Sequence, residues 1–123
     1  MTNEELINSA KSVAITKKVS EETVVGEVGS ALVTDKGNIY TGISIHAPCG
    51  LGFCGESSAI ASMVTNGENK IKTIVAVDGQ GNIFSPCGRC RETIRQINKE
   101  NMDAEIILSN KVVKLRDLLP DPY

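Results

Sequence analysis

Residues 71–77 read Ile-Lys-Thr-Ile-Val-Ala-Val, a nearly uninterrupted apolar run. Strands that are buried on both faces of a parallel sheet have this composition. Helical patterns lie on either side of the run: one spans about residues 54–65 and ends at Asn66-Gly67, and another begins after Pro86. A strand between two helices predicts crossover connections and helices that cover a sheet.

The rest of the chain supplies further strands and one more helix. Four segments have the β-branched or alternating composition of strands: residues 28–34, 39–45, 105–108 and 112–115. The first two are joined by Asp-Lys-Gly-Asn at 35–38, which predicts a hairpin. A capping box at residues 2–5 predicts a helix over about residues 3–17. We therefore expect residues 1–123 to form one α/β domain, a three-layer α/β/α fold around a mixed five-stranded sheet.

Composition excludes several classes of function. The 13 Lys and Arg against 15 Asp and Glu give a net charge of −2, which argues against a nucleic-acid partner. No apolar run approaches the roughly 20 residues of a membrane span, and the acidic start, Met-Thr-Asn-Glu-Glu, lacks a signal-peptide pattern. We expect a cytoplasmic protein with no membrane partner, whose thiols stay reduced.

The four cysteines are Cys49, Cys54, Cys87 and Cys90. In a reducing compartment such cysteines are metal ligands or catalytic groups more often than disulfides. Residues 54–56 read Cys-Gly-Glu, and residues 86–90 read Pro-Cys-Gly-Arg-Cys. Three thiolates can hold a zinc ion and leave its fourth position for water, and the carboxylate of Glu56 beside that water can move protons.

The predicted elements place these cysteines near one another. Cys54 lies at the start of the second helix, and Cys87 and Cys90 lie in the first turn of the third. Helix N-termini favour the thiolate over the thiol, and both helices follow strands of one sheet, so their starts can converge at its edge. Three thiolates on Zn²⁺ leave a net charge of −1, and Arg89 and Arg91 are the candidates to offset it.

Two alternatives to an open catalytic site follow from the same residues. Cys49 could complete a closed four-cysteine zinc site in a non-catalytic protein that binds a ligand, or Cys87 and Cys90 could form a redox pair. The closed site leaves Glu56 without a role, and the redox pair does not require a second Cys-x-Glu segment. We therefore favour the open site.

A Cys-x-Glu segment followed about thirty residues later by Pro-Cys-x-x-Cys is the signature of zinc deaminases, with cysteine in place of histidine. On these motifs the chain resembles the small homotetrameric cytidine deaminases, and within that superfamily it is most similar to the blasticidin S deaminases. The resemblance runs from about Val28 to Tyr123 and is carried by residues 29–32, 37–42, 50–56, 85–91 and 118–120.

The resemblance implies a zinc ion on the three cysteines, one per chain. It also implies hydrolytic deamination of a cytosine-like ring in a small molecule, either cytidine or a nucleoside analogue such as blasticidin S. Glu56 would take a proton from zinc-bound water and deliver protons to the ring nitrogen and the leaving ammonia. The Gly55 amide would donate to the base carbonyl, and the Ser85 carbonyl would contact the amine. The resemblance further implies a homo-oligomer, a tetramer, in which Tyr123 closes the site of a neighbouring subunit.

The chain departs from the family pattern where nucleoside-specific members bind ribose. Those members carry an Asn and a Glu two residues apart on the second strand, and here the positions are Ser44 and His46, which share a face of that strand. We expect both to contact substrate, although His46 could also be a satisfied side chain at a strand end. A base-stacking aromatic would fall near Gly26. These changes favour a nucleoside analogue or a modified base over ordinary cytidine.

Two further departures lie close to the zinc ligands. The loop before Cys54 is one residue short of the family pattern. Ser57 replaces an Arg that shields the thiolates in many members, which shifts that task to Arg89 or Arg91.

Overall fold

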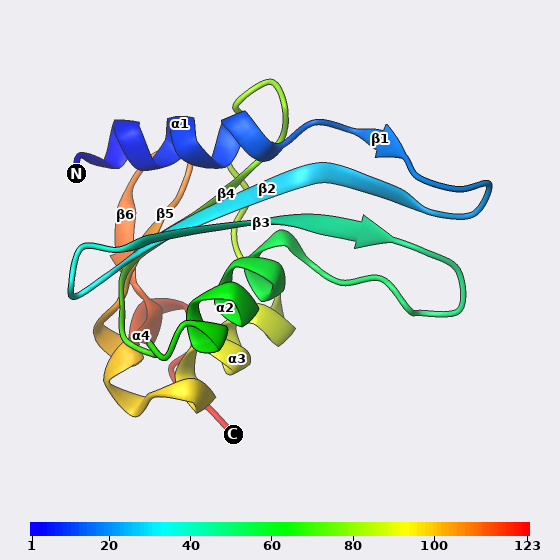
Figure 1. Ribbon diagram of the computed structural model, residues 1–123. Helices are drawn as coiled ribbons and strands as arrows, with labels where there is room; N and C mark the ends of the chain where they lie inside the picture. The colour runs from blue at the N-terminus through cyan, green and yellow to red at the C-terminus, as the bar shows by residue number, and fades with distance from the viewer.

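The computed structural model describes all 123 residues (Figure 1). In chain order the elements are α1 (Asn3–Val13), β1 (Lys17–Lys18), β2 (Val24–Thr34), β3 (Ile39–His46), α2 (Gly55–Thr65), β4 (Ile71–Val77), α3 (Gly88–Ile97), the 3-10 helix η1 (Lys99–Asp103), β5 (Glu105–Ile107), β6 (Val112–Lys114) and α4 (Leu115–Leu118). The predicted α/β fold with a mixed sheet is confirmed, although the sheet has six strands rather than five.

The sheet places β2 and β4 at its centre. β2 pairs antiparallel with β3 on one side and with β4 on the other, β4 pairs parallel with β5, and β5 pairs antiparallel with β6. The sixth strand, β1, adds only two residue pairs to the N-terminal end of β2. β4 is therefore a buried central strand as expected, but only one of its two neighbours is parallel.

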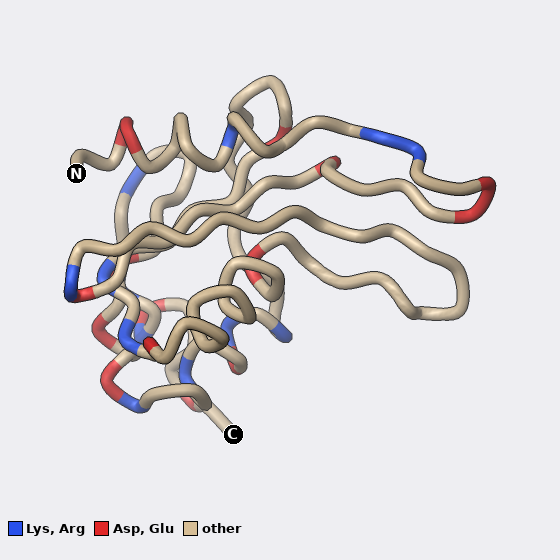
Figure 2. The backbone as a smooth tube through the Cα atoms, in the orientation of Figure 1, with Lys and Arg blue, Asp and Glu red and all other residues tan.

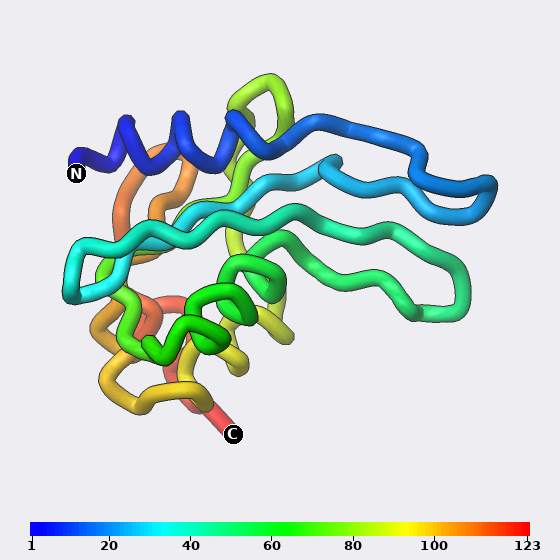
Figure 3. Tube along the Cα trace, in the orientation of Figure 1, coloured from blue at the N-terminus to red at the C-terminus, as the bar shows by residue number.

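Helices cover both faces of the sheet. α1 packs on one face, and the other face carries α2 and α3 (Figure 1). Successive residues of β4 separate the two apolar cores: Ile74 packs with Met63 and Ile94 beneath α2 and α3, whereas Val75 packs with Leu6 beneath α1. The two termini consequently lie on opposite sides of the sheet (Figure 3).

The first helix ends earlier than predicted. Its capping box is present, since the Thr2 hydroxyl accepts from the Glu5 amide while the Glu5 carboxylate accepts from the Thr2 amide, but the helix stops at Val13 instead of residue 17. Lys17 and Lys18 pair with Val25 and Val24 at the start of β2 across a short turn, and this strand pairing overrides the helical pattern. β2 itself begins at Val24 rather than residue 28.

Two short helices were not predicted. η1 lies between α3 and β5. α4 occupies Leu115–Leu118, so it overlaps the end of the expected strand 112–115 and the start of the tail.

None of the helices is long and apolar enough to span a membrane. Lys and Arg are interspersed with Asp and Glu along the backbone (Figure 2).

One irregularity in the sheet positions the site. The pairing of β2 with β3 shifts register between Val25 and Gly29, so that residues 26–28 form a bulge in β2. Gly26 adopts a φ of 79°, a conformation that favours glycine. The Ser44 hydroxyl of β3 accepts a hydrogen bond from the Val28 amide at 3.0 Å and thereby fixes the β2 bulge.

Candidate active site

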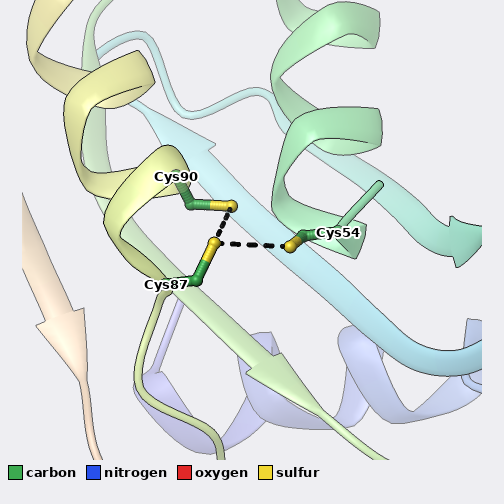
Figure 4. A group of neighbouring side chains, drawn as sticks. All are labelled: Cys54, Cys87 and Cys90. Atoms are coloured by element: carbon green, nitrogen blue, oxygen red, sulfur yellow. Dashed lines mark hydrogen bonds between the residues drawn. The ribbon is translucent and has the colours of Figure 1, made fainter. Parts of the chain in front are cut away.

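Three cysteine side chains converge at the starts of α2 and α3 (Figure 4). Cys54 and Cys87 are the capping residues that immediately precede the two helices, and Cys90 lies in the first turn of α3. The Sγ atom of Cys87 lies 3.4 Å from that of Cys54 and 3.5 Å from that of Cys90. All three sulfurs are within 4.8 Å of one another, and the group is able to hold a metal ion.

The donor set fits zinc. Four-coordinate Zn²⁺ with Zn–S bonds of about 2.3 Å holds its sulfurs about 3.8 Å apart, close to the spacing found here. Burial raises the pKa of the Cys54 and Cys90 thiols, and the Glu56 carboxylate raises that of Cys90 further. Burial also opposes ionisation of the Cys87 thiol. Hydrogen bonds to its sulfur, which include those from the Cys90 and Arg89 backbone amides, together outweigh burial and lower the pKa of Cys87. Three thiolates at this spacing therefore require a cation, which zinc would provide.

Glu56 is buried beside the thiol cluster. It occupies the first turn of α2, and only 5% of its surface is exposed. Burial raises the pKa of its carboxyl group. Together with Cys54 and Cys87 it lines one cleft, so Glu56 and two of the three cysteines border the same space.

That cleft has a volume of about 600 Å³, within the ~300–1,000 Å³ range of small-molecule sites. Its reactive end is formed by the starts of α2 and α3, and its far end by β2 and β3. Phe53 and Phe84 also line it, and 44% of the Phe84 surface is exposed. Neither ring was placed in the site from the sequence, although each lies within three residues of a predicted zinc ligand.

The predicted substrate residues on β3 border the far end of the cleft. Ser44 and His46 both line it, as their shared strand face indicated. The Ser44 hydroxyl already accepts from Val28, which leaves its own proton to donate. His46 Nδ1 lies 3.4 Å from an oxygen of Glu27, a residue that the sequence did not single out.

Gly55 and Ser85 also line the cleft. The Gly55 amide and the Ser85 carbonyl have no hydrogen-bond partner within the chain. A Cβ atom at position 55 would lie 3.2 Å from the Val28 carbonyl oxygen, so glycine allows α2 to approach the sheet closely. A free donor and a free acceptor thus border the space beside the sulfurs.

Arg91, a candidate to offset the thiolate charge, forms hydrogen bonds with groups other than the thiolates. Its guanidinium donates to the carbonyls of Pro86 and Leu118, at 2.7 and 3.0 Å, and to the Ser85 hydroxyl at 3.1 Å. Arg91 therefore fixes the loop before α3 to the C-terminal segment.

The other polar groups near the sulfurs are Arg89 and Ser57. Arg89 is exposed and lines the cleft. The Ser57 hydroxyl lies 3.9 Å from Cys90 Sγ and forms a hydrogen bond with it. Ser57 is thus a polar contact of the cluster, a role that the sequence, in which it marks only a missing arginine, did not indicate. Charge compensation by Arg89 remains a prediction.

Two residues lie outside the cluster and the cleft. Cys49 is exposed, adopts a φ of 61° and is not part of the sulfur group, so the four-cysteine arrangement is not formed. Tyr123 is 95% exposed and does not line the cleft of its own chain. Its amide donates to the Glu92 carboxylate at 3.0 Å, which anchors the end of the chain.

Comparison with known proteins agrees with this geometry. Residues 1–104 match the cytidine and deoxycytidylate deaminase zinc-binding region. Among curated relatives, a cytidine deaminase of Mycobacterium tuberculosis is 32% identical over 99 residues, which cover 78% of this chain and 71% of the relative. A blasticidin-S deaminase of Bacillus cereus is 36% identical over 107 residues, which cover 78% of this chain and 76% of the relative.

Solved structures extend the similarity over the whole chain. The crystal structure of the Mycobacterium tuberculosis cytidine deaminase has a TM-score of 0.83 at 26% identity, and the match covers 100% of this chain and 98% of that one. The cytidine deaminase of Burkholderia pseudomallei has a TM-score of 0.80 at 28% identity, with 100% of both chains covered. The chain therefore belongs to the zinc-binding cytidine and deoxycytidylate deaminase family and is a zinc-dependent hydrolytic deaminase.

Proposed function

We propose that the protein removes the exocyclic amine from a cytosine-like ring in a small molecule, with Glu56 as the proton shuttle. The substrate is a nucleoside or a nucleoside analogue such as blasticidin S. The observation that carries this proposal is the buried Glu56 carboxyl, which lines the same cleft as Cys54 and Cys87, two of the three cysteines of the sulfur group. The names of the relatives, cytidine deaminase and blasticidin-S deaminase, point to the same ring.

The residues of the chain divide the chemistry among them. Zinc on Cys54, Cys87 and Cys90 would supply a Lewis acid and lower the pKa of a water at its fourth position. Glu56 takes a proton from the attacking water, gives it to the ring nitrogen, and transfers the second proton to the departing ammonia. Its raised pKa supports this role, because a buried carboxyl takes up a proton more readily than an exposed one.

Orientation of the ring falls to two backbone groups. The unpaired Gly55 amide donates to the ring carbonyl, and the unpaired Ser85 carbonyl accepts from the amine that is removed. Phe53 and Phe84 offer apolar surface for the ring in place of the family's base-stacking aromatic, whose position falls near Gly26. Ser44 and His46 contact the part of the substrate that is remote from the ring.

The assembly and location follow from the same proposal. We expect a homotetramer in the cytoplasm, where reduced thiols are available for zinc. The exposed Tyr123 would close the cleft of a neighbouring subunit. Light scattering should give four chains per particle, and Tyr123→Ala should lower turnover without loss of zinc.

The function is tested by an ammonia-release screen on the zinc-loaded protein. The substrates are cytidine, deoxycytidine, blasticidin S and cytosines modified on the ring. We expect release from at least one of them. A protein that holds one zinc per chain and releases ammonia from none of them would contradict the proposed substrate class.

A further inference from the structure

The far end of the cleft carries an acidic side chain that the proposed chemistry does not use. Glu27 lies within the β2 bulge, residues 26–28, and lines the cleft. Bulges beside binding sites commonly redirect a side chain. Here the Ser44 hydroxyl bonds to the amide next to Glu27 in sequence, that of Val28, and holds the bulge in place. The hydrogen-bonded bulge of β2 thus fixes the backbone at Glu27.

Glu27 has one polar partner, His46. Its carboxylate oxygen lies 3.4 Å from His46 Nδ1. An ionised carboxylate only accepts hydrogen bonds, so Nδ1 is the donor in this contact, and Nε2 of a neutral imidazole is then an acceptor. The Glu27 and His46 side chains are 51% and 78% exposed, so both remain accessible to a ligand in the cleft.

No basic side chain offsets the carboxylate at this end. Arg89 is the only lysine or arginine that lines the cleft, and it belongs to α3 beside the zinc ligands. Glu27 forms no ion pair with it or with any lysine. The far end of the cleft therefore presents hydrogen-bond acceptors and negative charge.

We infer that Glu27, with His46, is the specificity-determining subsite for the part of the substrate remote from the ring. The inference rests on the proposed function, which assigns the ring to the other end of the cleft. The subsite takes a substituent that carries hydrogen-bond donors and no negative charge, such as a hydroxyl or an ammonium group. A phosphate there would face the Glu27 carboxylate at short range without a compensating cation. Nucleosides and amine-bearing analogues are therefore preferred over nucleotides.

The test compares two ligands that cannot be deaminated and that differ only at the 5′ position. 5′-Amino-5′-deoxyuridine and uridine 5′-phosphate are titrated by calorimetry into zinc-loaded wild type, Glu27→Gln and Glu27→Lys. Glu22→Gln is the matched control, because Glu22 is an exposed glutamate of the β1–β2 turn outside the cleft. Zinc content and unfolding midpoints establish that each variant is folded.

We expect the wild type and Glu22→Gln to bind the amine at least about ten-fold more tightly than the phosphate. Glu27→Gln should reduce that ratio by about ten-fold, and Glu27→Lys should favour the phosphate. An unchanged ratio in both Glu27 variants, or no binding of either ligand to the wild type, would overturn the inference. Ammonia release from cytidine is measured on the same preparations. A wild type that discriminates between the ligands and releases no ammonia supports the subsite and contradicts the proposed reaction.

Discussion

Gly42 of β3 lies directly beneath Ala59 of α2, so closely that a Cβ atom at position 42 would lie 2.3 Å from the Ala59 amide nitrogen. This contact sets the distance between the sheet and the helix that carries Cys54 and Glu56. The first prediction follows from it. Gly42→Ala should push α2 away from the sheet and lower the free energy of unfolding by about 1–3 kcal/mol.

Urea denaturation of the zinc-loaded protein measures the effect of Gly42→Ala. Gly88→Ala is the control, because no atom lies within 4 Å of a Cβ atom built at position 88, and it should change stability by less than about 0.5 kcal/mol. Equal midpoints for the two variants would show that the Gly42–Ala59 contact does not limit helix position.

Glu56→Gln separates the proton shuttle from metal binding. The amide is nearly isosteric and leaves the three sulfurs intact, so we expect one zinc per chain. Ammonia release should fall by at least about 10²-fold, because the amide cannot accept and return protons. Zinc content and initial rates measure both effects. Glu21→Gln, an exposed site in the β1–β2 turn, should retain wild-type rates, and retained turnover in Glu56→Gln would contradict the assigned role.

Cysteine substitutions distinguish an open site from a closed one. Cys87 contacts both other sulfurs of the cluster, whereas Cys49 lies outside it. Cys87→Ala should therefore lose zinc, and Cys49→Ala should keep one zinc per chain after dialysis. Elemental analysis measures the difference. Equal loss from the two variants would favour the four-cysteine alternative.

Asn101 is a buried polar residue that joins three backbone segments. Its side-chain oxygen accepts from the Ile71 amide at 2.9 Å, and its amide group donates to the carbonyls of Asn69 and Ile94 at 2.9 and 3.0 Å. Asn101→Leu would leave these backbone groups unpaired and should cost about 3 kcal/mol of stability. Chemical denaturation tests this. Asn110→Ala, in an exposed turn, should have little effect, and a similarly small effect at position 101 would refute the expectation.

The Glu68 carboxyl should make the free energy of unfolding depend on pH. The Tyr40 hydroxyl donates to its carboxylate at 2.6 Å and holds the carboxyl pKa below its ordinary value. This contribution to stability is complete above the ordinary carboxyl pKa of about 4.3 and is lost as the pH falls through the lower folded value. Glu68→Gln should therefore be less stable than wild type near neutral pH.

Urea midpoints of Glu68→Gln and wild type should differ by a constant amount at neutral pH and converge below about pH 4. Zinc release in acid affects both proteins and does not enter the difference. A difference that stays constant throughout an acid titration to well below that pH would show that the Tyr40–Glu68 bond is not linked to proton uptake.

The parts of the fold that were predicted well are those with strong local signals. The capping box at Thr2, the apolar strand at residues 71–77 and the turn at residues 35–38 are each encoded by neighbouring residues. The predicted end of α1 was wrong because Lys17 and Lys18 pair with Val25 and Val24 of β2, and this strand pairing was not predicted from the sequence. α4 was missed because four residues are too short for a helical period to be recognised.

The candidate site shows the same division. Cys54, Glu56, Cys87 and Cys90 could be named from their spacing, and the structure brings the three sulfurs together. Glu27 could not be named, and Ser57 was noted only as the place of a missing arginine, because their importance depends on contacts with His46 and Cys90 from other segments of the chain. Arg91 was named for its charge, yet its guanidinium is occupied by backbone carbonyls that only the folded chain brings within reach.

The β2 bulge is a place where β2 can gain or lose residues without a change in the rest of the sheet. Residues on its C-terminal side, from Gly29 onward, are paired with β3 and with β4, and α2 packs on these strands. Insertions or deletions at 26–28 can therefore remodel the outer wall of the cleft while the helix that carries Glu56 stays seated on the same strands. Evolution can in this way exchange the molecule that is processed without re-engineering the reaction, and a designer can vary positions 27 and 28 for that purpose while keeping Gly26, whose positive φ favours glycine.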